Sequence, residues 1–188
     1  RTREISFTAS EGTWMSVDVS PDGQWLVFDL LAHVYRLPIG GGPAQNLTAG
    51  SGIAVNFHPR ISPDGRLVAF VSDRRGQNNL WVMSADGSSP RAVFTDNNVR
   101  VAQPAWTPDG NYIVVVRQLL PVGTAQGSSG IWMYHRDGGD GVRLVTDAGA
   151  VNPSVSPDGK FLYYQVRAGQ GNDAVRGPGL LLWAEPPA

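Results

Sequence analysis

The stretch Ser62-Pro63-Asp64-Gly65, followed after one residue by Leu67-Val68-Ala69-Phe70, decides the fold of this chain. Proline presets φ at the second turn position, aspartate accepts hydrogen bonds from nearby backbone amides, and glycine adopts a positive φ without strain. The apolar run after the turn is typical of a strand that is buried on both faces. The stretch therefore predicts the tip of a hairpin and the buried strand that leaves it.

The same turn occurs four times along the chain. Its copies are Ser20-Pro21-Asp22-Gly23, Ser62-Pro63-Asp64-Gly65, Thr107-Pro108-Asp109-Gly110 and Ser156-Pro157-Asp158-Gly159. The four prolines stand 42, 45 and 49 residues apart, and an apolar run follows every copy. A repeat of this length with strand-like flanks is typical of a four-stranded propeller blade.

Two further patterns in the repeat predict the third and fourth strands of each blade. The third carries an aromatic residue after an aliphatic one, and the fourth ends in threonine. The third-strand pairs are Val34-Tyr35, Leu80-Trp81, Ile131-Trp132 and Leu182-Trp183. We therefore predict an all-β fold, a partial β-propeller of about four blades, each a four-stranded antiparallel sheet.

The predicted boundaries follow the repeat. Residues 1–8 form the last strand of a preceding blade, residues 9–48, 49–95 and 96–146 form blades, and residues 147–188 form an incomplete blade. Within the last unit, residues 168–188 are a divergent tail rich in glycine and proline. Because an open array would leave unpaired sheet edges and bare blade faces, we expect the chain to be part of a longer propeller.

Composition excludes several classes of protein. The 188 residues include 23 Gly and 14 Pro, too many for a helical bundle, while 41% hydrophobic and 16% charged residues exclude a disordered chain. The net charge of −1, without a basic block, argues against a nucleic-acid or anionic-lipid partner. No apolar run reaches the ~20 residues of a membrane span, and the absence of cysteine excludes thiol catalysis.

The repeat resembles the WD40-like PD40 repeat of TolB-type propellers over residues 1–167. The resemblance rests on the turn, on Ser72-Asp73-Arg74-Arg75-Gly76 and on Asn79-Leu80-Trp81-Val82-Met83. A narrower resemblance, in residues 11–23 and 27–31, is to the N-terminal propeller that precedes the metal-dependent catalytic domain of large exported amidohydrolases. The repeat is also similar to that of tricorn and prolyl oligopeptidase relatives.

The resemblance implies a function and a location. It implies a periplasmic or secreted protein whose propeller gates or binds substrate for a separate amidohydrolase domain. The alternatives are a TolB-like module that binds a protein or peptide, and the propeller of a serine peptidase. The expected partners are the remaining blades, a catalytic domain or partner protein, and a peptide or small-molecule substrate.

Catalytic chemistry is not expected within these residues. An amidohydrolase metal site needs His-x-His and further His and Asp ligands, whereas the three histidines, His33, His58 and His135, are scattered. No Gly-x-Ser-x-Gly elbow is present, and the glycines at 169 and 171 match a dinucleotide fingerprint only loosely. We therefore predict no catalytic residue, no metal ligand and no cofactor in this segment.

Polar residues alternate with apolar ones along each first strand. The eight positions four and two before the turn hydroxyl hold Ser16 and Asp18, His58 and Arg60, Gln103 and Ala105, Asn152 and Ser154, and all of them except Ala105 are polar. Alternation with a period of two directs one face into the blade core, with Met15, Val17 and Val19 on that face in the first blade, and the other face to water. In a propeller the wet face of the innermost strand lines the central channel, either as a hydrated wall or as a binding surface.

The loops between second and third strands point to a face for a partner. They span Ser72 to Asn79 and Arg117 to Gly130, and the second is the longest stretch predicted without strand before the tail. We expect a substrate, peptide or partner domain to meet the face that carries them. Its members are Trp14, His58, Asp73, Arg74 and Gln103.

Overall fold

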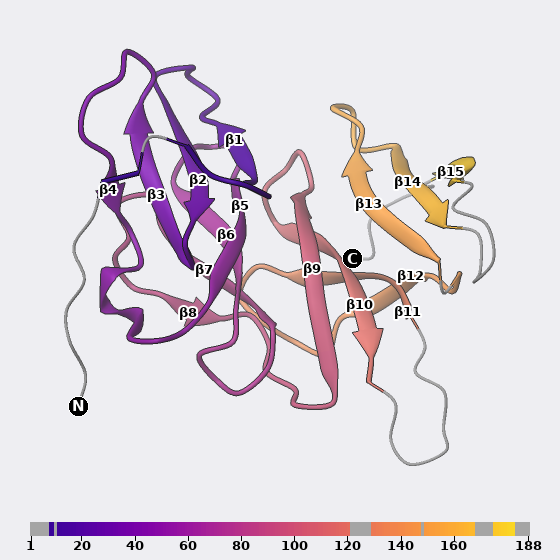
Figure 1. Cartoon of the computed structure of the whole chain (residues 1–188). Coiled ribbons are helices and arrows are strands. Elements are labelled where there is room, and N and C mark those ends of the chain that lie inside the picture. The colour runs from indigo at the N-terminus through magenta and orange to yellow at the C-terminus, as the bar shows by residue number, and fades with distance from the viewer. Residues whose placement is uncertain (1–7, 10, 121–128, 148, 168–174, 183–188) are drawn as a thin grey trace.

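The computed structural model describes residues 8–9, 11–120, 129–147, 149–167 and 175–182, which form four antiparallel sheets (Figure 1). The first sheet holds β1 (Val17–Val19), β2 (Trp25–Leu30), β3 (His33–Pro38) and β4 (Gln45–Asn46). The second holds β5 (Asn56–Ile61), β6 (Leu67–Ser72), β7 (Asn79–Ser84) and β8 (Arg91–Ala92). The third holds β9 (Val99–Trp106), β10 (Tyr112–Leu119), β11 (Ser129–His135) and β12 (Val142–Val145). The fourth holds β13 (Ala150–Val155), β14 (Phe161–Arg167) and β15 (Val175–Leu182).

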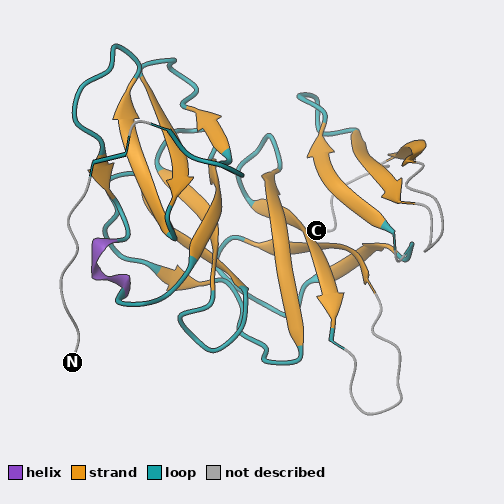
Figure 2. Cartoon of the chain, viewed as in Figure 1, coloured by secondary structure: helices purple, strands orange, loops and turns teal. Residues whose placement is uncertain are grey.

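The sheets follow one another as the blades of a partial propeller. Within each sheet the strands pair in chain order, and the first strands β1, β5, β9 and β13 of successive sheets lie beside one another. The predicted fold, all-β with about four blades, is confirmed. Figure 2 shows the only helical element of the described residues, the three-residue 3-10 turn Ala49–Ser51. No helix in the described part of the chain has the length and apolarity needed to cross a membrane.

The four turns have the hydrogen bonds that their sequence predicts. In the second blade the Ser62 hydroxyl donates to Asp64 Oδ1 at 2.6 Å and accepts the Leu67 amide proton at 2.9 Å. The hydroxyl bond lowers the pKa of the Asp64 carboxyl. The turn glycines Gly23, Gly65, Gly110 and Gly159 have φ of 67°, 71°, 68° and 72°, as predicted.

Three apolar cores fill the spaces between neighbouring blades. The strands β6 and β10 are buried on both faces because one face packs on the preceding blade and the other on the following blade, whereas β2 and β14, which were predicted to be buried in the same way, are buried mainly on one face. The first core includes Val27 and Phe70, the second Val82 and Ile113, and the third Met133 and Leu162. The outer face of the first blade is different, because no described blade covers it. Met15, Val17 and Val19, predicted to enter a blade core, are exposed.

Two predictions of strand position are corrected by the pairing. Arg117 pairs with Gly130, and Gln118 with Ser129, so the stretch from Arg117 to Gly130 begins and ends in strand. In the fourth blade Gly179, and not Trp183, pairs with Tyr164 at the register of the third-strand aromatic. Part of the predicted tail, Val175–Leu182, thus forms β15. Residues 1–7, 121–128 and Trp183 lie outside the described residues.

Gly23→Val should lower the free energy of unfolding by about 1–3 kcal/mol, because a β-branched side chain is strained at positive φ. A Cβ at Gly23 would meet no atom within 4 Å, so the loss isolates backbone strain from steric overlap. Gly40→Val is the matched control, since Gly40 also has open space but lacks a positive φ. Chemical denaturation of both variants measures the difference, and equal midpoints would contradict the prediction.

Candidate functional site

The first strands of the second, third and fourth blades share a bulge at the positions predicted to line the channel. Two residues of β5, β9 and β13 lie opposite a single residue of the second strand. The bulged pairs are His58-Pro59, Gln103-Pro104 and Asn152-Pro153. The residue before each proline is left-handed, with φ of 53°, 54° and 52°. Proline suits a bulge because it has no amide proton to give to the ladder.

The bulged residues are linked from blade to blade by hydrogen bonds. The Gln103 backbone amide donates to His58 Nδ1 at 3.3 Å, and the Asn152 amide donates to Gln103 Oε1 at 2.8 Å. The Gln103 side-chain amide also donates to Asn152 Oδ1, and Asn152 Nδ2 donates to Gln165 Oε1 at 2.7 Å. The side chains of His58 and Gln103 therefore each accept the amide proton of the bulged residue in the next blade. We call this series the bulge relay.

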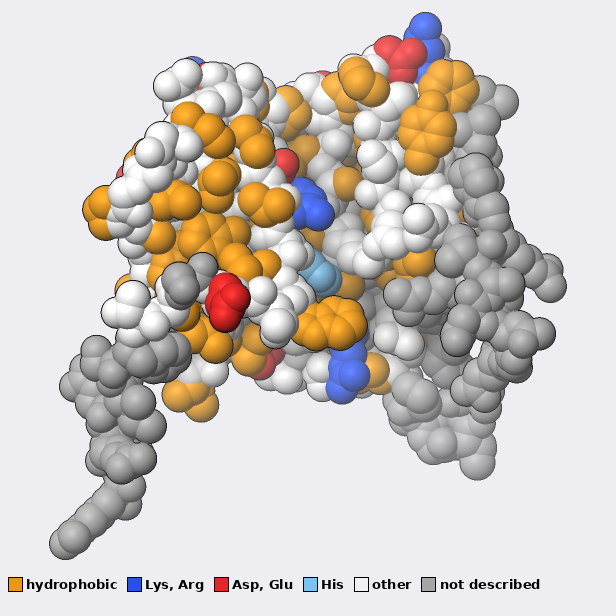
Figure 3. All heavy atoms as spheres, turned by 45° about the horizontal axis from the view of Figure 1, so that its top comes forward, with side chains coloured by type: hydrophobic (Ala, Val, Ile, Leu, Met, Phe, Trp, Pro, Cys, Tyr) orange, Lys and Arg blue, Asp and Glu red, His pale blue; other side chains and the backbone are white. Residues whose placement is uncertain are grey.

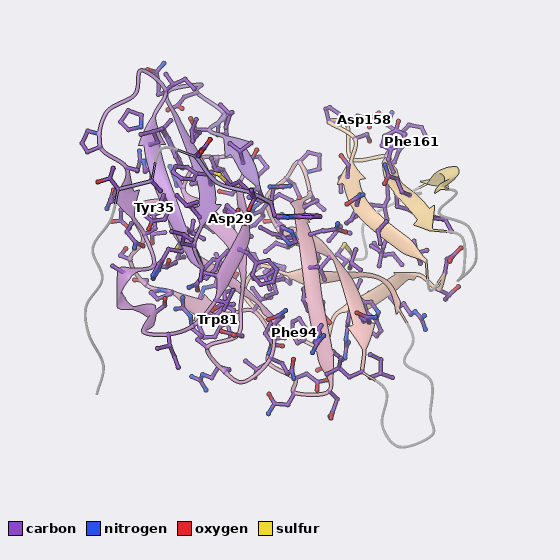
Figure 4. All side chains as sticks on the ribbon, in the orientation of Figure 1. Asp29, Tyr35, Trp81, Phe94, Asp158 and Phe161 are labelled. Carbon is purple, nitrogen blue, oxygen red and sulfur yellow. The ribbon has the colours of Figure 1, made fainter. Side chains whose placement is uncertain are left out.

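A buried carboxylate completes the relay in the first blade. Asp29 belongs to β2 and is labelled in Figure 4. Its Oδ1 accepts the Ser16 amide proton at 2.7 Å, and its Oδ2 accepts the amide proton of His58 in β5 at 2.7 Å. Asp29 was not among the predicted site residues, although an acid within the apolar strand Trp25–Leu30 was a signal for it. Asp18 acts in parallel, because its Oδ2 accepts the Ile61 amide proton at 2.8 Å.

The predicted wall residues lie in the first strand of each sheet, except Ser16, which precedes β1, and several of their polar atoms are already engaged. His58 is part-buried, and burial is the main cause that lowers the pKa of its ring; the Arg60 charge adds to this and the Asp29 charge opposes it. Arg60 Nη1 donates to the Pro59 carbonyl at 2.8 Å. A basic side chain and a histidine are visible in the hollow between the sheets (Figure 3).

A shallow pocket opens beside this wall, between the first and second blades. It has a volume of about 170 Å³, and Trp14, Asp29, Leu31 and Phe57 contribute to its lining. Trp14 is fully exposed and has a φ of 61°. It is therefore the predicted site residue whose side chain is most available to a ligand.

Asp73 and Arg74, which the sequence grouped with this face, lie at the turn between β6 and β7. Asp73 Oδ1 accepts the Val55 amide proton at 2.8 Å. The Arg74 guanidinium lies 4.7 Å from the centre of the Trp81 ring, and its Nη2 donates to Asn56 Oδ1 at 2.9 Å. Both side chains thus make contacts that hold the second blade together. Among the described residues, no three histidine or acidic side chains are grouped as metal ligands would be.

Comparison with known proteins assigns the repeat to a family. A family model described as the TolB beta propeller domain matches residues 1–175. The chain belongs to this family. Two curated relatives are similar to this TolB-type propeller. The uncharacterized protein Atu1656 of Agrobacterium fabrum is 30% identical over 156 residues, which are 80% of this chain and 50% of that protein. The uncharacterized peptidase YuxL of Bacillus subtilis is 33% identical over 155 residues, which are 63% of this chain and 23% of that protein.

A solved structure supports the fold. The putative TolB from Agrobacterium tumefaciens has a TM-score of 0.64 at 24% identity, covering 80% of this chain and 53% of that one. The TolB-type propeller described here therefore spans about half the length of the first relatives that it matches, and less of YuxL.

Gln103→Ala should lower the stability of this TolB-type propeller by about 1 kcal/mol, because the Asn152 amide and side chain both lose a partner. Amide hydrogen exchange at Asn152 should become faster. Gln118→Ala is the control, since Gln118 is exposed near the end of β10. If Gln103→Ala leaves the rate of amide hydrogen exchange at Asn152 unchanged, the relay contributes nothing to the junction of the third and fourth blades.

Proposed function

We propose that this chain is the non-catalytic propeller segment of a larger exported hydrolase, and that it binds or gates substrate for a separate catalytic domain. The observation that carries the proposal is a pair of sheet faces that no described blade covers. Both faces have the residues of a blade-to-blade interface. We therefore expect further blades or domains to pack against both faces.

The first uncovered face belongs to the first blade. Its Leu26, Phe28 and Tyr35 occupy the positions of Val68, Phe70 and Trp81 in the second blade, as the strand pairing shows. The second-blade residues are at most 5% exposed, whereas the first-blade residues are only partly buried and Val17 beside them is 57% exposed. A stacked aromatic pair, Phe28 and Tyr35, stands at the centre of this face. Such a face is typical of an interface that lacks its partner.

The second uncovered face belongs to the fourth blade. Tyr163 takes the position that Val27, Ala69 and Val114 occupy in the other blades. Those three residues are completely buried, whereas Tyr163 is 45% exposed. Because the central residue is larger, the neighbour on this side differs from an ordinary blade. A separate domain or an altered blade suits this face better than a copy of the first three blades.

The class of the parent hydrolase rests on similarity. The resemblance of residues 11–23 and 27–31 to amidohydrolase propellers favours a metal-dependent amidohydrolase. The similarity to YuxL, which is named as an uncharacterized peptidase, favours the second candidate, the propeller of a peptidase. Export to the periplasm or the cell exterior follows from the same resemblance. A TolB-like module that binds a protein or peptide is the third candidate, and it requires no catalytic domain.

Phe28→Ala and Phe70→Ala test the uncovered face with identical residues at equivalent positions. In the 188-residue chain Phe70→Ala should cost about 3–5 kcal/mol, as for a buried core aromatic. Phe28→Ala should cost less, about 2 kcal/mol, because the ring is only partly buried. Denaturant unfolding of both variants gives the comparison. Equal losses would mean that the outer face is already buried, and would remove the main support for the proposal.

The full-length protein, expressed from its natural reading frame, tests the activity. Its hydrolysis of peptidyl p-nitroanilides and of cyclic amides should be measured with and without a chelator and with and without a fluorophosphonate. Loss of activity with the chelator, restored by divalent metal, supports the amidohydrolase. Loss with the fluorophosphonate supports the serine peptidase. A full-length protein without any hydrolase domain would overturn the hydrolase proposal and leave the interaction module.

A further inference from the structure

We propose that His58 is a pH-sensitive staple between the second and third blades, and that protonation of its ring releases the Gln103 amide and loosens this junction at the channel wall. The inference is independent of the proposed hydrolase function. It rests on the bulge relay and on the chemistry of its members.

The geometry fixes the protonation state of the ring. A backbone amide can only donate, so His58 Nδ1 must carry a lone pair to accept the proton of Gln103 at 3.3 Å. The neutral ring therefore carries its proton on Nε2. A second proton can enter only at Nδ1, where it would face the Gln103 amide proton. Protonation thus replaces an attraction between the blades with a repulsion.

The three bulged residues differ in this respect. Gln103 and Asn152 occupy the same position as His58 in the next two blades, and neither side chain titrates. The Asn152 amide donates to Gln103 Oε1 at 2.8 Å whatever the pH. Of the relay bonds between bulged residues, only the one between the second and third blades is therefore sensitive to pH. Acidification should act on this junction and leave the next one closed.

The charges around His58 determine the direction of the effect. The groups that face it are Asp29 of β2, whose Oδ2 accepts the His58 amide proton, and Arg60 of β5, while β9 contributes the uncharged Gln103. Burial and Arg60 together outweigh Asp29, so the pKa of His58 is lower in the folded chain than its ordinary value. In the unfolded chain the ring binds its proton first, so stability falls as pH decreases below about 6.5 and levels off below the folded pKa.

The 188-residue chain allows a direct test between about pH 7.5 and pH 5, above the range in which carboxylates titrate. The unfolding equilibrium constant should increase as pH falls below about 6.5, by at most about tenfold per pH unit, as for the uptake of one proton. Amide exchange at Gln103, corrected for the intrinsic pH dependence, should accelerate over the same range. The Asn152 amide should keep its protection.

His58→Gln is the decisive variant, because it installs the residue that the third blade uses at this position. His58→Asn, the choice of the fourth blade, provides a second acceptor if the first variant folds poorly. Either variant should lose the pH dependence of both readouts. His135→Gln, which removes a histidine that is 43% exposed, should retain the wild-type profile. An unchanged profile in the His58 variants, or a His58 ring that titrates without any response at Gln103, would overturn the proposal.

Discussion

The rest of the structure depends on the hydrogen bonds made by the side-chain hydroxyl at the start of each turn. This hydroxyl donates to the aspartate two residues later and accepts the amide proton five residues later, on Trp25, Leu67, Tyr112 and Phe161. These two hydrogen bonds, one to the carboxylate and one from the backbone amide, fix the point at which the second strand leaves the turn. The side-chain alternation of that strand is then set relative to the first strand, and it determines which residues face each neighbouring blade.

The bulges add a second constraint within the first strands β5, β9 and β13. A left-handed residue directly before a proline is unfavourable, at about 1–3 kcal/mol for each site. The structure offsets this strain by directing each freed amide proton to a side chain of the preceding blade. Neighbouring blades are therefore joined by the apolar cores between them and by hydrogen bonds from the bulged residues of their first strands. The same polar atoms are not free for a ligand, which leaves the exposed Trp14 and the shallow pocket beside it as the more open surface.

Stacked arginines contribute a third feature of the blades. Arg36, Arg74 and Arg117 lie over Trp25, Trp81 and Trp132 at 4.1, 4.7 and 4.3 Å from the ring centres. In Figure 4, Trp81 and Phe94 mark two of the aromatic rings that carry such an arginine. Arg117 also donates to the Tyr134 hydroxyl and pairs with Asp96. In each case the guanidinium lies over the aromatic ring, so these arginines contribute to packing within the blades.

The sequence by itself determined the turns, the strands, the blade repeat and the polar face of the innermost strands. These features depend on groups a few residues apart: the Leu67 amide donates to the Ser62 hydroxyl, and the alternation along Pro59 to Ile61 needs no distant partner. Only the tertiary structure decided that Asp29 joins the relay, that His58 accepts from Gln103, and that Val17 and Val19 lie uncovered. Gln103 is 45 residues from His58, and Asn152 is 49 residues from Gln103. Contacts of this kind form only when neighbouring blades pack, because the local sequence does not determine which atom of another blade will lie within hydrogen-bonding distance.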